Sequence, residues 1–206
     1  WANGETFALG GKQIKNVAGY DLIRLLVGSE GTLAVITEIT LKLIPKPKVV
    51  KEALVGFANP IDAVNALVNV CQSGIQPSTA EYMTDFCVDA AIQFLDVKKQ
   101  FDSANAYIIW QVDGYDEGSV NSQLKMIENV CQNYQSKFWY SMNTIDDSNH
   151  IWAIRRSISL GLKKIGGEKK SEDVVVPPAS VPHFLAELES MAFECGIKVL
   201  GYGHLG

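Results

Sequence analysis

Residues 52–60 read EALVGFANP, a short apolar strand that runs directly into the start of a helix. Asn59 is a preferred N-cap residue and Pro60 is a preferred first helical residue. The helix is expected to cover residues 60–73 and to end at Gly74. Its apolar positions keep the helical spacing: Ile61, Val64, Leu67, Val68 and Cys71. A strand joined this closely to a helix predicts a layered domain that contains both element types.

The same alternation continues towards the C-terminus. Further strands are expected at residues 79–83, 107–112, 136–142, 173–176 and 197–202, and further helices at 85–95, 117–133, 146–162 and 181–195. Several of these strands are short and half-polar, which is typical of antiparallel sheets with one solvated face. The sequence therefore predicts an α+β fold, with one mostly antiparallel sheet and helices on one face.

The N-terminal part of the sequence is organised differently. Residues 1–14 have the turn signal of a short hairpin. Leu33–Ile44 is rich in Val, Ile, Thr and Leu and predicts a long strand. Pro45-Lys46-Pro47 cannot continue a strand ladder and forms a stiff connector. We therefore expect two domains, residues 1–47 and residues 48–206.

Composition limits the function classes. The 206 residues are 47% apolar and 20% charged, the balance of a globular protein with a core. The net charge of −5 argues against nucleic acids and anionic membrane surfaces as partners, and it leaves room for a local basic pocket. No apolar run reaches the roughly 18 residues that a membrane span needs. The four cysteines lie far apart and are predicted to be free thiols in a reducing, cytoplasmic compartment rather than disulfides or metal ligands: Cys71, Cys87, Cys131 and Cys195.

A glycine-rich loop, Gly28-Ser29-Glu30-Gly31-Thr32, precedes the predicted strand of the first domain. Two glycines permit positive φ and a close approach of the backbone to a ligand, and successive amides there could bind a pyrophosphate. The alternative is a tight turn that needs glycine for its conformation alone. The loop is not a Walker A motif, since no Gly-Lys-Ser/Thr follows it.

The C-terminal sequence Gly201-x-Gly203-x-x-Gly206 formally matches the dinucleotide fingerprint. We reject this interpretation because no helix and no acidic residue follow it. His204, at the end of the last predicted strand, is a candidate base or metal ligand. The alternative is a structural histidine.

The predicted helix 146–162 carries the other candidate group. Trp152, Arg155, Ser159 and Leu162 share one helical face. Arg155, beside a hydroxyl on a partly apolar face, is suited to clamp a carboxylate. The alternative is a solvated arginine pair with Arg156. Four lysines follow, either as a basic rim that attracts an anion or as a solvated loop: Lys163, Lys164, Lys169 and Lys170.

Three stretches together resemble one family. They are Lys15-Asn16-Val17-Ala18-Gly19-Tyr20-Asp21-Leu22, Gly28-Ser29-Glu30-Gly31-Thr32-Leu33-Ala34-Val35-Ile36-Thr37-Glu38 and Gly203-His204-Leu205-Gly206. The family is that of the FAD-dependent 2-hydroxy-acid dehydrogenases of the vanillyl-alcohol-oxidase superfamily, which includes the glycolate oxidase D-subunit, D-lactate dehydrogenases and D-2-hydroxyglutarate dehydrogenases. Ala34 departs from the glycine that is common in the family at that position.

The resemblance implies a division of roles along the chain. Residues 1–47 would be the C-terminal end of a PCMH-type FAD-binding domain, and residues 48–206 a ferredoxin-like-type cap domain, truncated at its C-terminus. The residues expected to contact FAD are Gly28, Ser29, Glu30, Gly31, Thr32, Val35 and Ile36. In the cap, Arg155 would bind the substrate carboxylate, assisted by Ser159 and by Lys170 or Lys169. His204 would hold a divalent metal of the Zn or Mn type that polarises the substrate hydroxyl.

The resemblance also implies an activity. The chain would be part of a FAD-dependent oxidoreductase that oxidises a small 2-hydroxy acid, glycolate or D-lactate, by hydride transfer to the flavin. It would be inactive alone, because it lacks the N-terminal FAD-binding segments. An electron-transfer subunit is an expected partner, and membrane association would come through such a partner. Two alternatives stay open: a non-catalytic cap-fold subunit that binds a partner or a small anion without flavin, and a ferredoxin-like regulatory module.

Overall fold

The computed structural model describes residues 1–166 and 169–204. The chain divides into two compact units, Trp1–Pro45 and Lys46–Gly206. Leu205 and Gly206, which end the C-terminal glycine motif, lie outside the described residues.

The first unit contains one short helix, α1 (Leu22–Leu26), and no strand. The predicted hairpin at residues 1–14 and the predicted strand Leu33–Ile44 are therefore wrong. Apolar side chains of the second segment lie open to solvent, and Leu43 is 87% exposed. A strand forms only where a neighbour accepts its backbone hydrogen bonds, and residues 1–45 supply no such neighbour.

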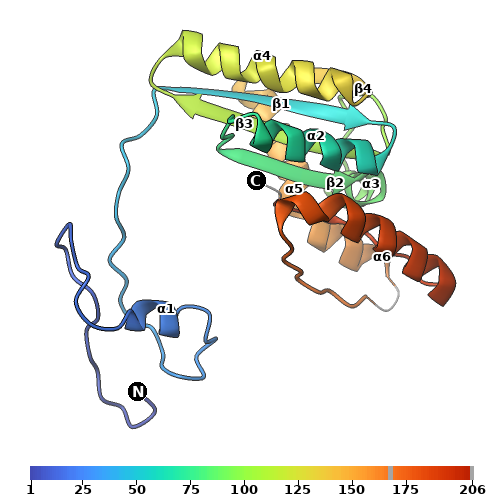
Figure 1. Ribbon diagram of the computed structural model, residues 1–206. Helices are drawn as coiled ribbons and strands as arrows, with labels where there is room; N and C mark the ends of the chain where they lie inside the picture. Colours follow the sequence, from blue (N-terminus) through green and yellow to red (C-terminus); the bar gives the residue numbers. More distant parts are fainter. Residues whose placement is uncertain (167–168, 205–206) are drawn as a thin grey trace. The chain divides into compact units, whose positions relative to one another are not determined.

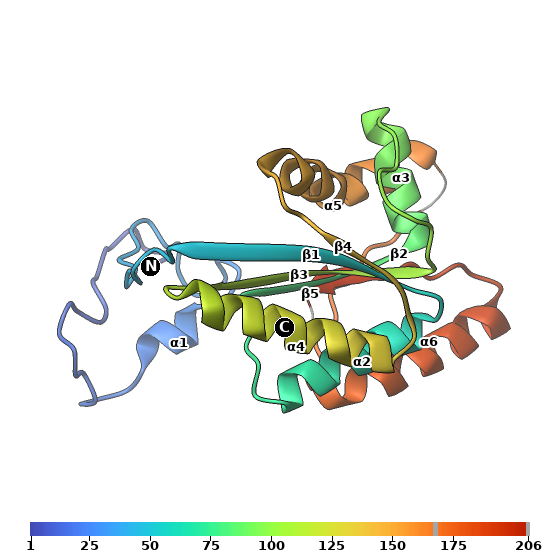
Figure 2. The ribbon, with the colours of Figure 1, turned by 90° about the horizontal axis from the view of Figure 1, so that it is seen from above.

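The second unit is built on a five-stranded sheet with the order β4-β1-β3-β2-β5; Figure 1 labels the first four of these strands and Figure 2 also labels β5. Every neighbouring pair is antiparallel. The predicted α+β class with an antiparallel sheet is confirmed. The strands are β1 (Val49–Phe57), β2 (Thr79–Thr84), β3 (Ala106–Gly114), β4 (Ser136–Ser141) and β5 (Tyr202–His204).

Helices cover both faces of this sheet, so the prediction of helices on one face is wrong (Figure 2). One face packs against α2 (Pro60–Gln72), α4 (Glu117–Asn133) and α6 (Val181–Cys195), which follows the short 3-10 turn Pro178–Ser180. The other face packs against α3 (Asp85–Leu95) and α5 (Ile145–Ile165).

The central strand β3 explains why both faces are covered. Ala106–Trp110 is buried without interruption. Ile108 and Trp110 belong to the core under α2 and α4, whereas Tyr107 and Ile109 belong to the core under α3 and α5. A strand that is buried on both faces has a continuous apolar run instead of an alternating one.

The C-terminal strands also differ from the prediction. Residues 173–176 form no strand, and β5 begins at Tyr202 rather than at residue 197. The start of β5 is set by its partner β2, which ends where α3 begins. The last hydrogen bond between the backbones of these two segments is donated by the Thr84 N–H to the Gly201 carbonyl (3.1 Å). The chain before Gly201 passes beyond the end of β2 and has no strand to pair with there.

Helix α5, which carries the predicted site residues, begins at a capping box. The Asp147 N–H donates to Thr144 Oγ1 (3.1 Å), and the Thr144 N–H donates to Asp147 Oδ2 (3.0 Å). Asp147 Oδ1 also accepts from the Tyr140 hydroxyl (2.8 Å), which ties the helix to β4. These hydrogen bonds, that of Thr144 foremost, lower the pKa of Asp147 below its usual 3.8.

The pH dependence of this cap can be tested with Asp147→Asn. Because the carboxyl has a lower pKa when folded, its stabilising effect is present above the unfolded pKa and is lost as the pH falls through the folded value. We expect the variant to have a lower Tm than the wild type at neutral pH, and this gap to close below about pH 3.8. Thermal melts followed by circular dichroism measure it. Asp146→Asn, outside the capping box, is the control, and an equal gap at every pH would contradict the assignment.

Candidate functional site

Among the described residues, Glu81 is the one charged side chain that is buried, at 3% exposure. It lies in the middle of β2, opposite Ile109 on β3 and His204 on β5. A buried carboxylate is costly unless charged partners and hydrogen bonds compensate it. Its partners therefore mark the place in this fold where charge is concentrated.

Arg155 of α5 is the first partner. Its Nε donates to Glu81 Oε2 (2.7 Å), and its Nη2 lies 2.6 Å from the same oxygen. The guanidinium carbon also lies 5.3 Å from the centroid of the Tyr202 ring, in a cation–π contact. The Arg155 side chain is only 15% exposed, so the helix, β2 and β5 together fix its direction.

His204 of β5 is the second partner. Its Nδ1 contacts Glu81 Oε1, while the rest of its side chain stays largely exposed. Since an ionised carboxylate only accepts hydrogen bonds, the hydrogen of a neutral His204 belongs on Nδ1 and the lone pair on Nε2. The structure thus brings Arg155 and His204, which are far apart in the sequence, to one carboxylate.

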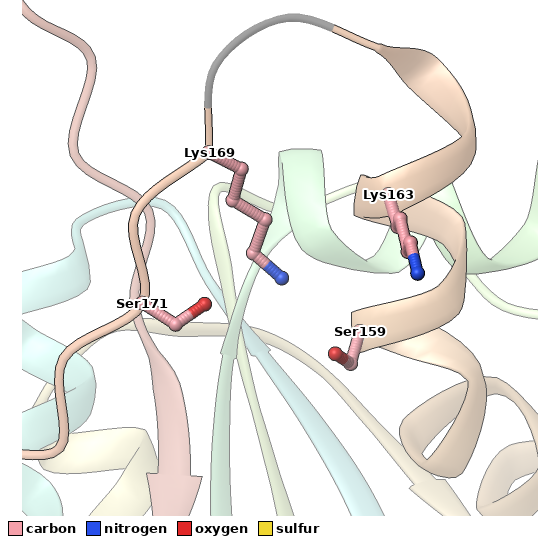
Figure 3. Close-up of a pocket in the computed structure, with 4 residues that line it drawn as sticks. All are labelled: Ser159, Lys163, Lys169 and Ser171. Atoms are coloured by element: carbon pink, nitrogen blue, oxygen red, sulfur yellow. The ribbon is translucent and has the colours of Figure 1, made fainter.

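A pocket of about 370 Å³ lies between α5 and the loop that follows it (Figure 3). Ser159 and Lys163 line it from the helix, and Lys169 and Ser171 line it from the loop. The four described residues of the lining supply two ammonium groups and two hydroxyls, a donor-rich set that suits a small anion. Ser159 is one helical turn from Arg155 on the same face, so the pocket begins one turn along α5 from the residue that pairs with Glu81.

Lys170, one of the two lysines that the resemblance offered for the substrate site, is not among the residues that line this pocket. Its Nζ forms an ion pair with Glu172 (3.2 Å), and its side chain is 88% exposed. Lys169 is the lysine that reaches the pocket with Ser159. The structure therefore brings Arg155 and His204 together at Glu81, and it places Ser159 and Lys169 in the lining of one pocket, whereas Lys170 belongs to neither group.

The predicted cofactor loop, Gly28–Thr32, belongs to the first unit. Gly28, Glu30 and Gly31 have positive φ, and the Ser29 carbonyl accepts from both the N–H and the hydroxyl of Thr32 (2.9 and 2.6 Å). The glycines are thus required by the turn itself. A Cβ at Gly28 or Gly31 would meet no atom within 4 Å, so the backbone conformation, and not a close neighbour, accounts for these glycines. Val35 and Ile36, the other predicted contacts, are exposed.

The candidate metal ligands and the cysteines can be placed in the part of the chain that the structure describes. It contains no group of three or more His, Cys, Asp or Glu side chains placed to hold a metal ion. All four cysteines are free, and burial raises the pKa of the Cys131 thiol to about 12 and that of Cys87 above its usual value. These two thiols are therefore protonated and poorly nucleophilic at neutral pH. No described helix combines the length and apolar character that crossing a membrane demands.

Sequence reasoning did not single out Glu81 as part of a site, although a signal existed. An acid stands in the middle of a strand whose four central residues are all buried. Such an acid requires a buried cation, and Arg155 was already a candidate. The pairing of β2 with β5, which adds His204, depends on residues more than a hundred positions apart and leaves no local pattern.

Comparison with known proteins supplies the family. Residues 46–206 match the family of FAD linked oxidases, C-terminal domain. The glycolate oxidase subunit GlcD of Bacillus subtilis is 30% identical over 205 residues, which cover 100% of this chain and 43% of that protein. A D-lactate dehydrogenase of Archaeoglobus fulgidus is 31% identical, with 100% and 44% coverage. The chain thus spans less than half the length of these relatives.

A solved structure supports the same fold. An alkyldihydroxyacetonephosphate synthase structure superposes with a TM-score of 0.58 and 18% sequence identity. The match covers 87% of this chain and 38% of that protein. At this identity the likeness concerns the fold alone.

Proposed function

The chain belongs to the family of FAD-linked oxidases through residues 46–206, and we propose that it forms the substrate-binding part of an oxidoreductase that converts a small 2-hydroxy acid of the glycolate or D-lactate type into the 2-oxo acid. The observation that carries the proposal is the attachment of Arg155 and His204 to the Glu81 carboxylate, beside a donor-rich pocket. The names of the relatives support this substrate class.

Arg155 binds the carboxylate of the acid in this proposal. The Nε and Nη2 edge of its guanidinium is occupied by Glu81, which leaves the N–H groups of Nη1 for the substrate. Ser159 and Lys169 line the neighbouring pocket and add a hydroxyl and a second positive charge. Of the two lysines that the sequence resemblance offered for this role, Lys169 and Lys170, we assign it to Lys169.

His204 holds the proton of the substrate hydroxyl. Its Nδ1 faces Glu81, so Nε2 is the nitrogen that accepts the proton as the carbon–oxygen double bond forms. FAD, when bound, supplies the acceptor for the hydride. We propose that residues 1–47 are the end of the FAD-binding domain and residues 48–206 the cap, and that Gly28–Thr32, Val35 and Ile36 contact the cofactor.

The proposal is tested by mixing the holoenzyme, purified with FAD, with D-lactate or glycolate in the absence of oxygen. Loss of the visible flavin absorbance and formation of the 2-oxo acid are expected. Binding of either acid without flavin reduction would instead favour a non-catalytic anion-binding module. A separate electron-transfer subunit is proposed as the partner that reoxidises the flavin.

Arg155→Lys tests the role of the arginine in substrate binding. Lysine keeps the charge but loses the planar guanidinium that serves Glu81 and the substrate at once. We expect KM to rise about tenfold to a hundredfold, the loss of one charged hydrogen bond worth about 1.5–3 kcal/mol. Steady-state kinetics with D-lactate measure it. Arg156→Lys, at the exposed neighbouring position, is the matched control, and an equal KM in both variants would remove Arg155 from the binding site.

A further inference from the structure

We infer that Glu81 is a positioning residue, whose buried carboxylate fixes the direction of the Arg155 guanidinium and the tautomer of the His204 imidazole. The kinetic consequences of this inference rest on the proposed function. The tautomer of His204 follows from the geometry of the cluster and can be measured without turnover.

The carboxylate divides its two oxygens between its two partners. Oε2 takes both contacts from Arg155, and Oε1 takes the contact from His204. The backbone of Glu81 is held on both sides, by β3 and by β5. With 3% exposure the carboxylate cannot turn towards solvent, so its partners must align to it.

For Arg155, this alignment selects one edge of the guanidinium. The Nε–Nη2 edge faces Glu81, and one face lies over the Tyr202 ring at 5.3 Å. A planar group held by one edge and one face has no free rotation left. The Nη1 edge is therefore presented in a single direction, which favours a carboxylate bound in one orientation.

For His204, the alignment selects the nitrogen that carries the hydrogen. A carboxylate oxygen can only accept, which places the hydrogen on Nδ1 and the lone pair on Nε2. Without the carboxylate nothing holds the hydrogen on Nδ1, and the other tautomer has no lone pair on Nε2. Control of a histidine tautomer by a buried carboxylate is a known way to prepare a base or a ligand nitrogen.

Glu81→Gln separates the two roles. The amide oxygen can still accept from Arg155, whereas the amide N–H₂ then faces His204 Nδ1 and requires the hydrogen on Nε2. In the holoenzyme we expect kcat for D-lactate to fall about a hundredfold, the contribution of a positioned base. KM should change less than about threefold, because the Arg155 contact survives.

Glu52→Gln is the matched control. Glu52 is a carboxylate on β1 whose oxygens accept from Ser148 Oγ (2.6 Å) and Trp152 Nε1 (2.8 Å) of the same helix α5. It contacts neither Arg155 nor His204 through these bonds. The control therefore repeats the chemical change and the loosening of α5, and its kcat and KM should stay within about twofold of the wild type.

The tautomer is read directly by ¹⁵N NMR of the histidine-labelled holoenzyme at about pH 8, after dialysis against EDTA, with His204→Gln to assign the signal. We expect hydrogen on Nδ1 in the wild type and on Nε2 in Glu81→Gln. The same tautomer in both proteins, or a kcat of Glu81→Gln equal to that of Glu52→Gln, overturns the inference. If the wild type reduces its flavin with neither hydroxy acid, the proposed function fails, and the tautomer measurement alone decides the role of Glu81.

Discussion

Arg155→Met is expected to lower the free energy of unfolding by about 3–5 kcal/mol, the cost of leaving a buried charge without its partner. The Glu81 carboxylate is 3% exposed and receives both the Nε and the Nη2 of Arg155. The remaining partner, His204, contacts the other oxygen and cannot replace the guanidinium. Methionine fills the space of the arginine stem but offers no donor, so the loss reflects charge rather than volume.

Chemical unfolding followed by tryptophan fluorescence measures this change. The control is Lys125→Met, which breaks an equally short ion pair with Glu128 (2.6 Å) on an exposed part of α4, where the lysine is 63% exposed. An exposed pair contributes about 0–1 kcal/mol. If Arg155→Met lowers the free energy of unfolding no more than this control does, Arg155 does not compensate a buried charge on Glu81. The double change Glu81→Leu with Arg155→Met should be more stable than Arg155→Met, because it removes the orphaned carboxylate.

The helices were predictable because their signals are local. The helix bounds 85–95, 117–133 and 181–195 coincide with those observed, and the helix after Asn59 ends within one residue of its predicted end. The cap at Asn59 is real, with the Ile61 N–H donating to its side chain (2.9 Å). Caps and spacing act within a few residues, so a sequence window contains the whole cause.

The failures concern interactions between distant segments. Leu33–Ile44 has the composition of a strand, but composition cannot supply the neighbour that a strand needs. Helices cover both faces of the sheet because α3 and α5 pack on the face opposite to α2 and α4. The uninterrupted apolar run of β3 was a signal for this burial on both faces. The spacing of residues along its helix identified Arg155 as a candidate carboxylate-binding residue. Its contact with Glu81 depends on the packing of α5 against β2, which no local pattern records.

Gly161→Val is expected to cost about 3 kcal/mol or more, at the upper end of the range for overpacking a core. Gly161 lies where α5 crosses α3, and a Cβ built on it would come within 2.6 Å of the Ala90 carbonyl carbon and 2.9 Å of the Ala91 nitrogen. These are backbone atoms of a helix, which cannot turn aside as a side chain can. The two helices must therefore separate, and the core that Ala91 and Ile158 share between them loses contacts.

Gly118→Val is the matched control for this prediction. Gly118 lies in the first turn of α4, is exposed, and a Cβ there would meet only Asp116 Oδ1 at 3.4 Å. The free energy of unfolding of this variant should stay within about 0.5 kcal/mol of the wild-type value.

The same substitution at Gly161 should also affect the pocket. Because Gly161 lies between Ser159 and Lys163, a shift of α5 moves two residues of the lining. Gly161→Val should therefore weaken binding of the hydroxy acid in the molecules that remain folded. Equal unfolding midpoints for the two variants in urea would show that α3 and α5 can separate freely, and that this close crossing does not hold the pocket in place.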